Sequence, residues 1–213
     1  MYDRNAIAPT VRHLLSNSLV PMKTLGMEFS DLDNSEALEI TKSWVDTVRS
    51  GVVIKSPGSP SSGLGLLLIG EPGHGKTTLA SVALQELIRT MAIPGLFMDY
   101  PKYLRMEKES WAQGENKDKL RETVREIYGD AKYSMPIFVL DDLGKEYTTQ
   151  SGWSENTFDA LLRSRFNAGL PTVITTNVPL NKWRAAYGEP MASFAYEAFI
   201  EVKVESDKGD RRK

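Results

Sequence analysis

The sequence predicts an α/β fold, a parallel five-stranded sheet flanked by helices. Short apolar runs of strand length alternate with stretches in which apolar residues recur at helical spacing. A glycine-rich loop separates the first apolar run from the helical segment that follows it. This alternation is typical of a parallel sheet, because each pair of neighbouring parallel strands needs a crossover connection.

Length and composition indicate one globular domain with a small appendage. The chain has 213 residues, of which 41% are hydrophobic, and a formal charge of −2. The absence of cysteine excludes disulfides, thiolate catalysis and Cys-ligated zinc. No apolar stretch has the roughly 18 to 20 residues of a membrane span, and the N-terminus does not resemble a signal peptide. We therefore expect a cytoplasmic protein with no membrane partner.

The first 33 residues carry mixed signals and are interpreted as an arm in front of a domain over residues 34–213. Val11, Leu14 and Leu15 form a short apolar cluster that suits either a contact with a partner or a strap over the chain's own core. The next helix starts after Asn34 or Ser35, either of which can cap it, and stops at Gly51.

The following elements are predicted from apolar runs and turn residues. Residues 56–63 contain only Ser, Pro and Gly, which indicates a flexible loop. Strands are expected at residues 64–69, 96–98, 137–140, 172–176 and 199–205. Helices are expected at residues 76–91, within 116–133, and from a cap at Ser154 to Gly169. The last strand alternates apolar and charged residues, as a half-exposed edge strand does.

The strongest motif is GEPGHGKT at residues 70–77, which matches G-x-x-x-x-G-K-[ST] between a predicted strand and a predicted helix. Its glycines allow the backbone N–H groups and the helix N-terminus to point at phosphates. Lys76 would contact the β- and γ-phosphates, and Thr77 would offer a hydroxyl to Mg²⁺. The side chain of His74 is expected to point out of the loop. The predicted nucleotide-binding residues are Gly70, Glu71, Pro72, Gly73, His74, Gly75, Lys76, Thr77 and Thr78.

A second motif, IFVLDD at residues 137–142, is an apolar run that ends in two acids. Both acids should lie at the carboxyl edge of the sheet, where α/β folds bind ligands. In a nucleotide hydrolase Asp141 would hold Mg²⁺, and Asp142 would orient or deprotonate the attacking water. Glu146 is a weaker candidate base.

The fourth predicted strand leads to Thr175, Thr176 and Asn177 at the same edge. Asn177 could sense the γ-phosphate or hold the lytic water. The sequence Asn-Val-Pro is equally compatible with a turn that merely starts a loop.

Together, GEPGHGKT, FVLDDLGKE and RSRFNAGLPTVITTN resemble the DnaC/IstB family of AAA+ ATPases, over roughly residues 25–212. The resemblance implies a P-loop NTPase fold of the AAA+, RecA-like type. It also implies ATP, Mg²⁺, homo-oligomers and binding to single-stranded DNA, and gives Asn177 the sensor-1 role beside the catalytic Lys76 and Asp142. Only 36 residues follow Asn177 (213 − 177), so no separate helical lid is expected.

The chain departs from the family pattern at the arginine that usually reaches a neighbour's γ-phosphate. Residues 192–196, the corresponding stretch, contain none. Arg184 is the nearest upstream candidate, and Arg211 and Arg212 resemble the sensor-2 arginine. Because such an arginine accelerates phosphoryl transfer by about 10³ to 10⁵, slow hydrolysis without a partner is expected.

These features favour an ATP-dependent loader that places a hexameric DnaB-type replicative helicase on DNA, with the arm contacting the helicase. The short arm is more typical of phage-encoded loaders, which act in the host cytoplasm. An IstB-like transposition helper and an ATP-gated DNA-binding scaffold with little hydrolysis are the alternatives. The candidate contacts for single-stranded DNA are Lys102, Arg105 and Lys108, interleaved with Tyr103 and Trp111, although such a group is more often a solvated helix face.

Overall fold

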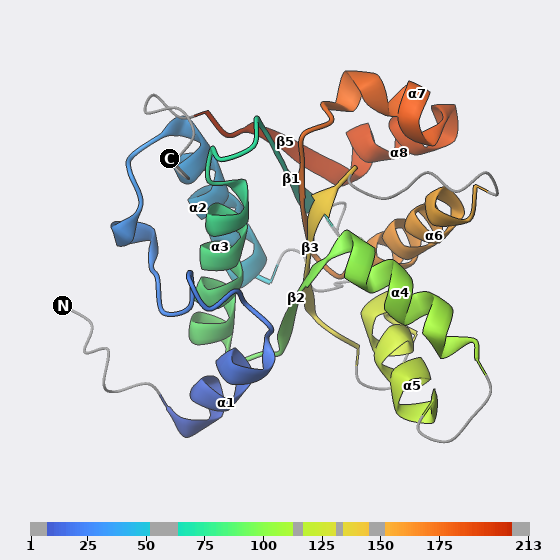
Figure 1. The fold of residues 1–213 in the computed structure, drawn as a ribbon. Helices are drawn as coiled ribbons and strands as arrows, with labels where there is room; N and C mark the ends of the chain where they lie inside the picture. Colours follow the sequence, from blue (N-terminus) through green and yellow to red (C-terminus); the bar gives the residue numbers. More distant parts are fainter. Residues whose placement is uncertain (1–7, 52–63, 113–116, 131–133, 145–151, 206–213) are drawn as a thin grey trace.

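The computed structural model describes residues 8–51, 64–112, 117–130, 134–144 and 152–205. Five parallel strands form one sheet in the order β2-β3-β4-β1-β5 (Figure 1). The strands are β1 (Gly65–Ile69), β2 (Gly95–Asp99), β3 (Ile137–Leu143), β4 (Thr172–Thr176) and β5 (Phe199–Lys203). The predicted fold class is confirmed, and β5 is an edge strand.

Helices cover both faces of the sheet (Figure 1). One face carries α1 (Pro9–Asn17), α2 (Glu36–Arg49) and α3 (Lys76–Met91). The other carries α4 (Tyr100–Ser110), α5 (Lys117–Tyr128), α6 (Trp153–Asn167), α7 (Trp183–Tyr187) and α8 (Glu189–Ala198). Two 3-10 turns, η1 (Phe29–Asp31) and η2 (Leu180–Lys182), lie between these elements. Within the described residues, no helix combines the length and apolarity needed to cross a lipid bilayer.

The sheet separates two apolar layers. Successive side chains of a strand point to opposite faces. Accordingly, Val139 packs in the layer under α2 and α3, whereas Phe138 and Leu140 pack in the layer under α4 and α6. All five residues of β1 are buried, because helices cover this central strand from both sides.

The structure corrects one predicted helix boundary, the start of α6. Ser154 does not cap α6: Gly152 is the N-cap, and Ser154 lies in the first turn, where its hydroxyl donates to Glu155. The helix predicted within residues 116–133 is confirmed as α5, which ends at Tyr128 because Gly129 adopts a φ of +88°. The Ser35 cap on α2 is confirmed by the N–H of Leu38, 3.2 Å from its hydroxyl. Residues 56–63 lie outside the described part of the chain.

The described part of the arm packs against α3 and the edge strand β2. Val11 and Val20 are buried in the core layer on the α3 side. The Phe97 N–H of β2 donates to the Ser18 carbonyl at 2.7 Å, so the arm covers part of the sheet edge. Gln85 of α3 is fully buried and fastens the arm at two points: its amide donates to the Thr24 carbonyl at 2.9 Å and accepts from the Gly26 N–H at 2.8 Å.

Arg165 holds together the opposite, amino edge of the sheet. This side chain is fully buried, and its five N–H groups donate to five oxygens at 2.6–3.3 Å. The acceptors are the carbonyls of Ile127, Met135, Pro136 and Pro171 and the hydroxyl of Thr172. Burial lowers the pKa of Arg165 to about 9, which still leaves the guanidinium charged at neutral pH. One side chain therefore joins α5, α6 and the starts of β3 and β4.

We predict that Arg165→Ala lowers the free energy of unfolding by at least about 3 kcal/mol, because several buried carbonyls lose their donor. Urea denaturation followed by circular dichroism measures the change. Arg125→Ala is the control, since this exposed arginine forms a surface ion pair with Glu122 and its replacement should cost less than about 1 kcal/mol. Equal losses in the two variants would contradict the role given to Arg165.

Candidate functional site

A cavity of about 630 Å³ opens at the carboxyl edge of the sheet, beside the N-terminus of α3. It is bounded by the glycine-rich loop, by the ends of β3 and β4, and by the arm. The lining residues are Pro21, Lys23, Thr24, Met27, Asp31, Leu32, Pro72, Gly73, Gly75, Lys76, Thr77, Thr78, Asp141, Asp142 and Asn177. The cavity thus brings together the three motifs that the sequence singled out.

The loop before α3 has the backbone shape that an anion site requires. Gly73 and Gly75 adopt φ values of +85° and +94°, and Gly75 is the N-cap of α3. The first turn of α3 therefore faces the cavity with its N–H groups, the positive end of the helix dipole. Lys76 is buried, and its ammonium donates to the carbonyls of Gly70 and Glu71 at 2.8 and 2.9 Å. These bonds hold the cation inside the loop.

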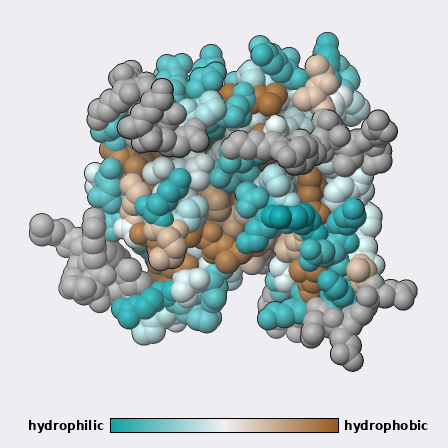
Figure 2. All heavy atoms as spheres, viewed as in Figure 1, coloured by the Kyte–Doolittle hydropathy of each residue, from teal (hydrophilic) through white to brown (hydrophobic). Residues whose placement is uncertain are grey.

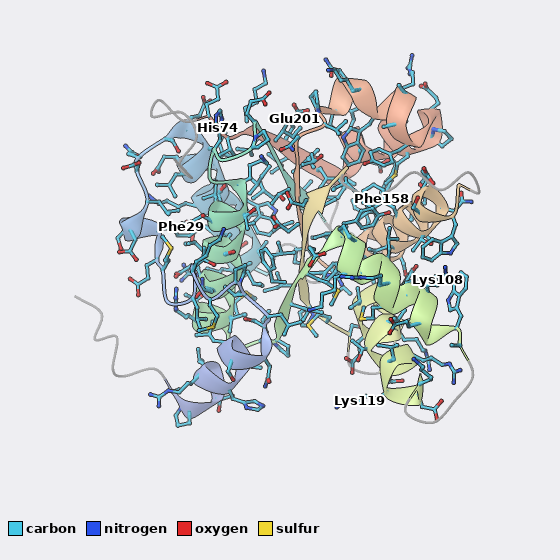
Figure 3. All side chains as sticks on the ribbon, in the orientation of Figure 1. Phe29, His74, Lys108, Lys119, Phe158 and Glu201 are labelled. Carbon is cyan, nitrogen blue, oxygen red and sulfur yellow. The ribbon has the colours of Figure 1, made fainter. Side chains whose placement is uncertain are left out.

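Three of the predicted nucleotide-binding residues lie on the outer side of the loop. Gly70, Glu71 and His74 line a separate groove of about 440 Å³ together with residues 203–205. Figure 3 shows His74 at the top of α3, near the loop. The outward direction expected for the His74 side chain agrees with this position, so His74 does not face the cavity.

Asp141 is the centre of the hydrogen bonding in the cavity. Its carboxylate is buried and accepts from the Thr77 hydroxyl, with distances of 3.0 Å to Oδ1 and 3.2 Å to Oδ2. The Thr175 hydroxyl of β4 donates to the same Oδ1 at 2.6 Å. Residues from α3, β3 and β4 thus meet at one carboxylate.

Asp142 and Asn177 are the other two predicted catalytic residues that the cavity contains. Both line it, Asn177 with an exposed side chain. The β3–β4 register shifts between Leu140 and Leu143, and Asp142, inside this irregularity, adopts a φ of +61°. Its N–H donates to the Thr175 hydroxyl at 2.9 Å. The sequence placed both acids just beyond the strand; the structure places them inside β3, which continues to Leu143.

The residues of the cavity fit a magnesium nucleotide. Mg²⁺ takes oxygen ligands and usually keeps several waters, so one hydroxyl and one carboxylate are a suitable protein contribution. Thr77 and Asp141 provide such a pair of adjacent oxygen groups. The N–H groups at the start of α3 and the Lys76 ammonium are suited to bind the phosphates of the same nucleotide.

Sequence reasoning missed two contributions to the site, a residue behind the cavity lining and a segment of the lining itself. Thr175 was passed over in favour of Asn177, although a polar side chain in a fully buried strand signals a specific partner. The arm was missed because residues 18–33 have no regular periodicity. Its contribution, Pro21, Lys23, Thr24, Met27, Asp31 and Leu32, is visible only once the arm is folded against α3.

Of the three candidate arginines, Arg184 is in the described part of the chain, and it does not line the cavity. Arg184 lies on α7 with an exposed side chain and forms an ion pair with Glu189. Arg211 and Arg212 lie outside the described residues, as does Glu146. Among the residues described, the cations that line the cavity are Lys23 and Lys76.

The three basic residues predicted to contact DNA are exposed on α4, but one of the two aromatic residues grouped with them is not. Lys102, Arg105 and Lys108 are exposed on this helix, and Figure 3 shows Lys108 on the side of the sheet opposite Phe29 of the arm. Tyr103, however, points inward: it is fully buried, and its hydroxyl donates to Glu107 at 3.4 Å. Burial raises the pKa of the Glu107 carboxyl. Tyr103 therefore cannot stack on a base, whereas Trp111 is 63% exposed.

The fold and the cavity define a P-loop nucleotide-binding protein. The sequence profile of the ATPase family associated with various cellular activities (AAA) matches residues 66–182, and the chain belongs to this family. A comparison with curated protein sequences gives no match.

Solved structures share the fold. The crystal structure of the DnaC helicase loader aligns with a TM-score of 0.65 and 23% identity, covering 87% of this chain and 100% of that one. DnaI aligns with a TM-score of 0.65 and 21% identity over 88% of this chain and 95% of its own. The replication initiator DnaA bound to AMPPCP and single-stranded DNA gives a TM-score of 0.64 and 16% identity, covering 91% of this chain and 53% of DnaA.

We predict that Gly70→Ala weakens nucleotide binding at least about tenfold, measured by titration with a fluorescent ATP analogue. A Cβ on Gly70 would lie 2.3 Å from the Val204 carbonyl oxygen, so the loop or the end of β5 must move. Gly51→Ala is the control: its φ is +75°, and among the described residues no neighbouring atom lies within 4 Å of the added Cβ. It should cost roughly 1 kcal/mol of stability and leave affinity unchanged. Unchanged affinity in Gly70→Ala would contradict this reading of the loop.

Proposed function

We propose that this chain is an ATP-dependent loader of a hexameric DnaB-type replicative helicase. The observation that carries the proposal is the cavity in which Thr77, Asp141 and Asp142 lie beside Lys76. The similarity of the whole described fold to DnaC and DnaI supports the helicase as partner.

The chemistry proposed for the cavity is ATP hydrolysis. Lys76 and the first turn of α3 bind the phosphates, and Thr77 and Asp141 hold Mg²⁺, which when bound would neutralise phosphate charge. Asp142 orients or deprotonates the attacking water, and Asn177 contacts that water or the γ-phosphate. Both residues line the cavity, and Asn177 is exposed to solvent.

Hydrolysis is proposed to be slow until a partner acts. The lining cations of the described cavity are lysines, and the Arg184 side chain is engaged by Glu189. An arginine from a neighbouring copy or a partner would then raise the rate. The same observation favours the alternative of an ATP-gated DNA-binding scaffold with little hydrolysis. A transposition helper would use the same nucleotide residues and differ in its protein partner.

Single-stranded DNA is proposed to contact α4. Lys102, Arg105 and Lys108 supply exposed cations, and Trp111 stands at the end of the same helix, with its ring 5.7 Å from that of Trp153. An exposed tryptophan held by a second ring is suited to stack on a base.

The arm is proposed to contact the helicase through three exposed apolar residues. Leu19, Met22 and Leu25 are 49%, 82% and 40% exposed, and we call them the arm strip. Figure 2 shows hydrophobic residues (brown) in the middle of one face of the molecule. The residues from 8 to 27 include Arg12 and Lys23 but no acid, so the strip suits an acidic, apolar segment of the helicase.

We predict that Lys76→Ala reduces ATP turnover at least about 100-fold, because the phosphates lose their buried cation. Phosphate release is measured alone, with single-stranded DNA and with the helicase. Lys42→Ala, on the exposed face of α2, should turn over like the wild type. Nucleotide binding without Lys76-dependent hydrolysis under any condition would reject the enzyme and favour the scaffold.

We also predict that Met22→Asp weakens the complex with the helicase at least about tenfold, which corresponds to about 1.4 kcal/mol. Calorimetric titration of the helicase measures this, and ATP turnover of the free protein should stay unchanged. Tyr196→Asp on α8, where the tyrosine is 61% exposed, is the matched control and should bind normally. If both variants bind like the wild type, the arm strip is not the contact.

A further inference from the structure

The Thr175 hydroxyl makes two hydrogen bonds that link the two acids of the cavity. It donates to Asp141 Oδ1 at 2.6 Å and accepts from the Asp142 N–H at 2.9 Å. A threonine hydroxyl has one proton, and here that proton lies toward the carboxylate. The side chain is fully buried, so water cannot replace either bond.

The position of Asp142 depends on this hydroxyl. Asp142 adopts a φ of +61°, a left-handed conformation that is unfavourable for a residue with a side chain. The register of β3 against β4 shifts at this point, and the Asp142 N–H is bonded to the Thr175 side chain of β4. The hydroxyl therefore anchors the irregular backbone from which the Asp142 carboxylate projects to the cavity.

The position of Asp141 depends on it as well. The two hydroxyls that donate to this carboxylate come from different elements, Thr77 from α3 and Thr175 from β4. Thr77 lines the cavity, whereas Thr175 lies behind the carboxylate and does not line it. Such a donor fixes the rotation of a carboxylate without competing for a ligand.

We propose that Thr175 is a positioning residue that aligns Asp141 and Asp142 together, so that metal binding and water activation are set by one buried hydroxyl. This inference rests on the proposed ATPase function. It concerns a residue that is fully buried and does not line the cavity.

Thr176, the next residue of β4, provides a matched control. It is equally buried, and its hydroxyl also makes two hydrogen bonds, one to the Leu143 carbonyl at 2.8 Å and one from the Val178 N–H at 3.0 Å. Neither bond involves Asp141 or Asp142. Thr175→Val and Thr176→Val therefore remove the same group, with the same shape, from neighbouring buried positions.

The test measures two properties of these variants: ATP turnover, and affinity for Mn²⁺ in the presence of a non-hydrolysable ATP analogue by electron paramagnetic resonance. We expect Thr175→Val to lower kcat about 10- to 100-fold and to weaken Mn²⁺ binding about tenfold. Its affinity for the nucleotide without metal should stay within about threefold of wild type, because Lys76 and the loop are untouched. Thr175→Ser, which keeps the hydroxyl, should restore both kcat and Mn²⁺ affinity.

Thr176→Val should lose thermal stability and keep wild-type kcat and Mn²⁺ affinity. Equal effects of Thr175→Val and Thr176→Val on kcat and Mn²⁺ affinity would overturn the inference, as would a Thr175→Ser variant as defective as the valine. If Thr175→Val does not fold, Thr175→Ala is compared with Thr176→Ala in the same way. A wild-type protein without turnover would reject the proposed ATPase, and the Mn²⁺ affinities would still decide the role of Thr175.

Discussion

The nucleotide cavity depends on one buried carboxylate, that of Asp141, and on the strand order that lets hydroxyls reach it. β4 lies between β1 and β3, so the loop that follows β1 and the acids of β3 are two strands apart. Thr77, at the start of α3, reaches across this distance to bond to Asp141. Thr175 bonds to the same carboxylate from β4, the strand in between. A buried carboxylate lowers the stability of the fold unless hydrogen-bond donors contact it. The fold therefore needs these two threonines to bury Asp141, whether or not a ligand is bound.

β4 is polar at both ends and apolar in the middle, and each end organises one edge of the sheet. At its start, Thr172 accepts from Arg165, which holds the connections around β3 and β4. At its end, Thr175 bonds to Asp141 and Asp142, the two acids of β3 that line the cavity. Val173 and Ile174 between them pack into the two core layers. The five residues of β4 thus hold Thr172, which bonds to the stabilising Arg165, at one end and Thr175, which bonds to the acids of the cavity, at the other.

The sequence was sufficient to predict the sheet, because its strands are continuous apolar runs, and α3, because the glycine loop fixes where that helix begins. It also predicted that Thr77 and Asp141 would meet, since their elements end at the same sheet edge. It could not reveal Thr175, because a hydroxyl's partner depends on the register between strands that are far apart in sequence. Tyr103 was misjudged because its neighbours in sequence are charged, whereas helical spacing turns it toward Phe138 and Tyr100 in the core. The cap at Ser154 failed because Gly152 can begin the helix earlier with a left-handed backbone.

The attachment of the arm to α3 also has a consequence for synthesis of the chain. The arm bonds to Gln85 and Arg89, residues 59 to 62 positions further along the sequence. A ribosome that adds about 5–20 residues per second needs roughly 3–12 s to make that intervening segment. During this time the hydrophobic residues of the arm have no native surface to cover. The arm therefore leaves the ribosome before α3 and cannot fold against it until α3 has emerged. The nucleotide cavity that the arm helps to line forms only after that.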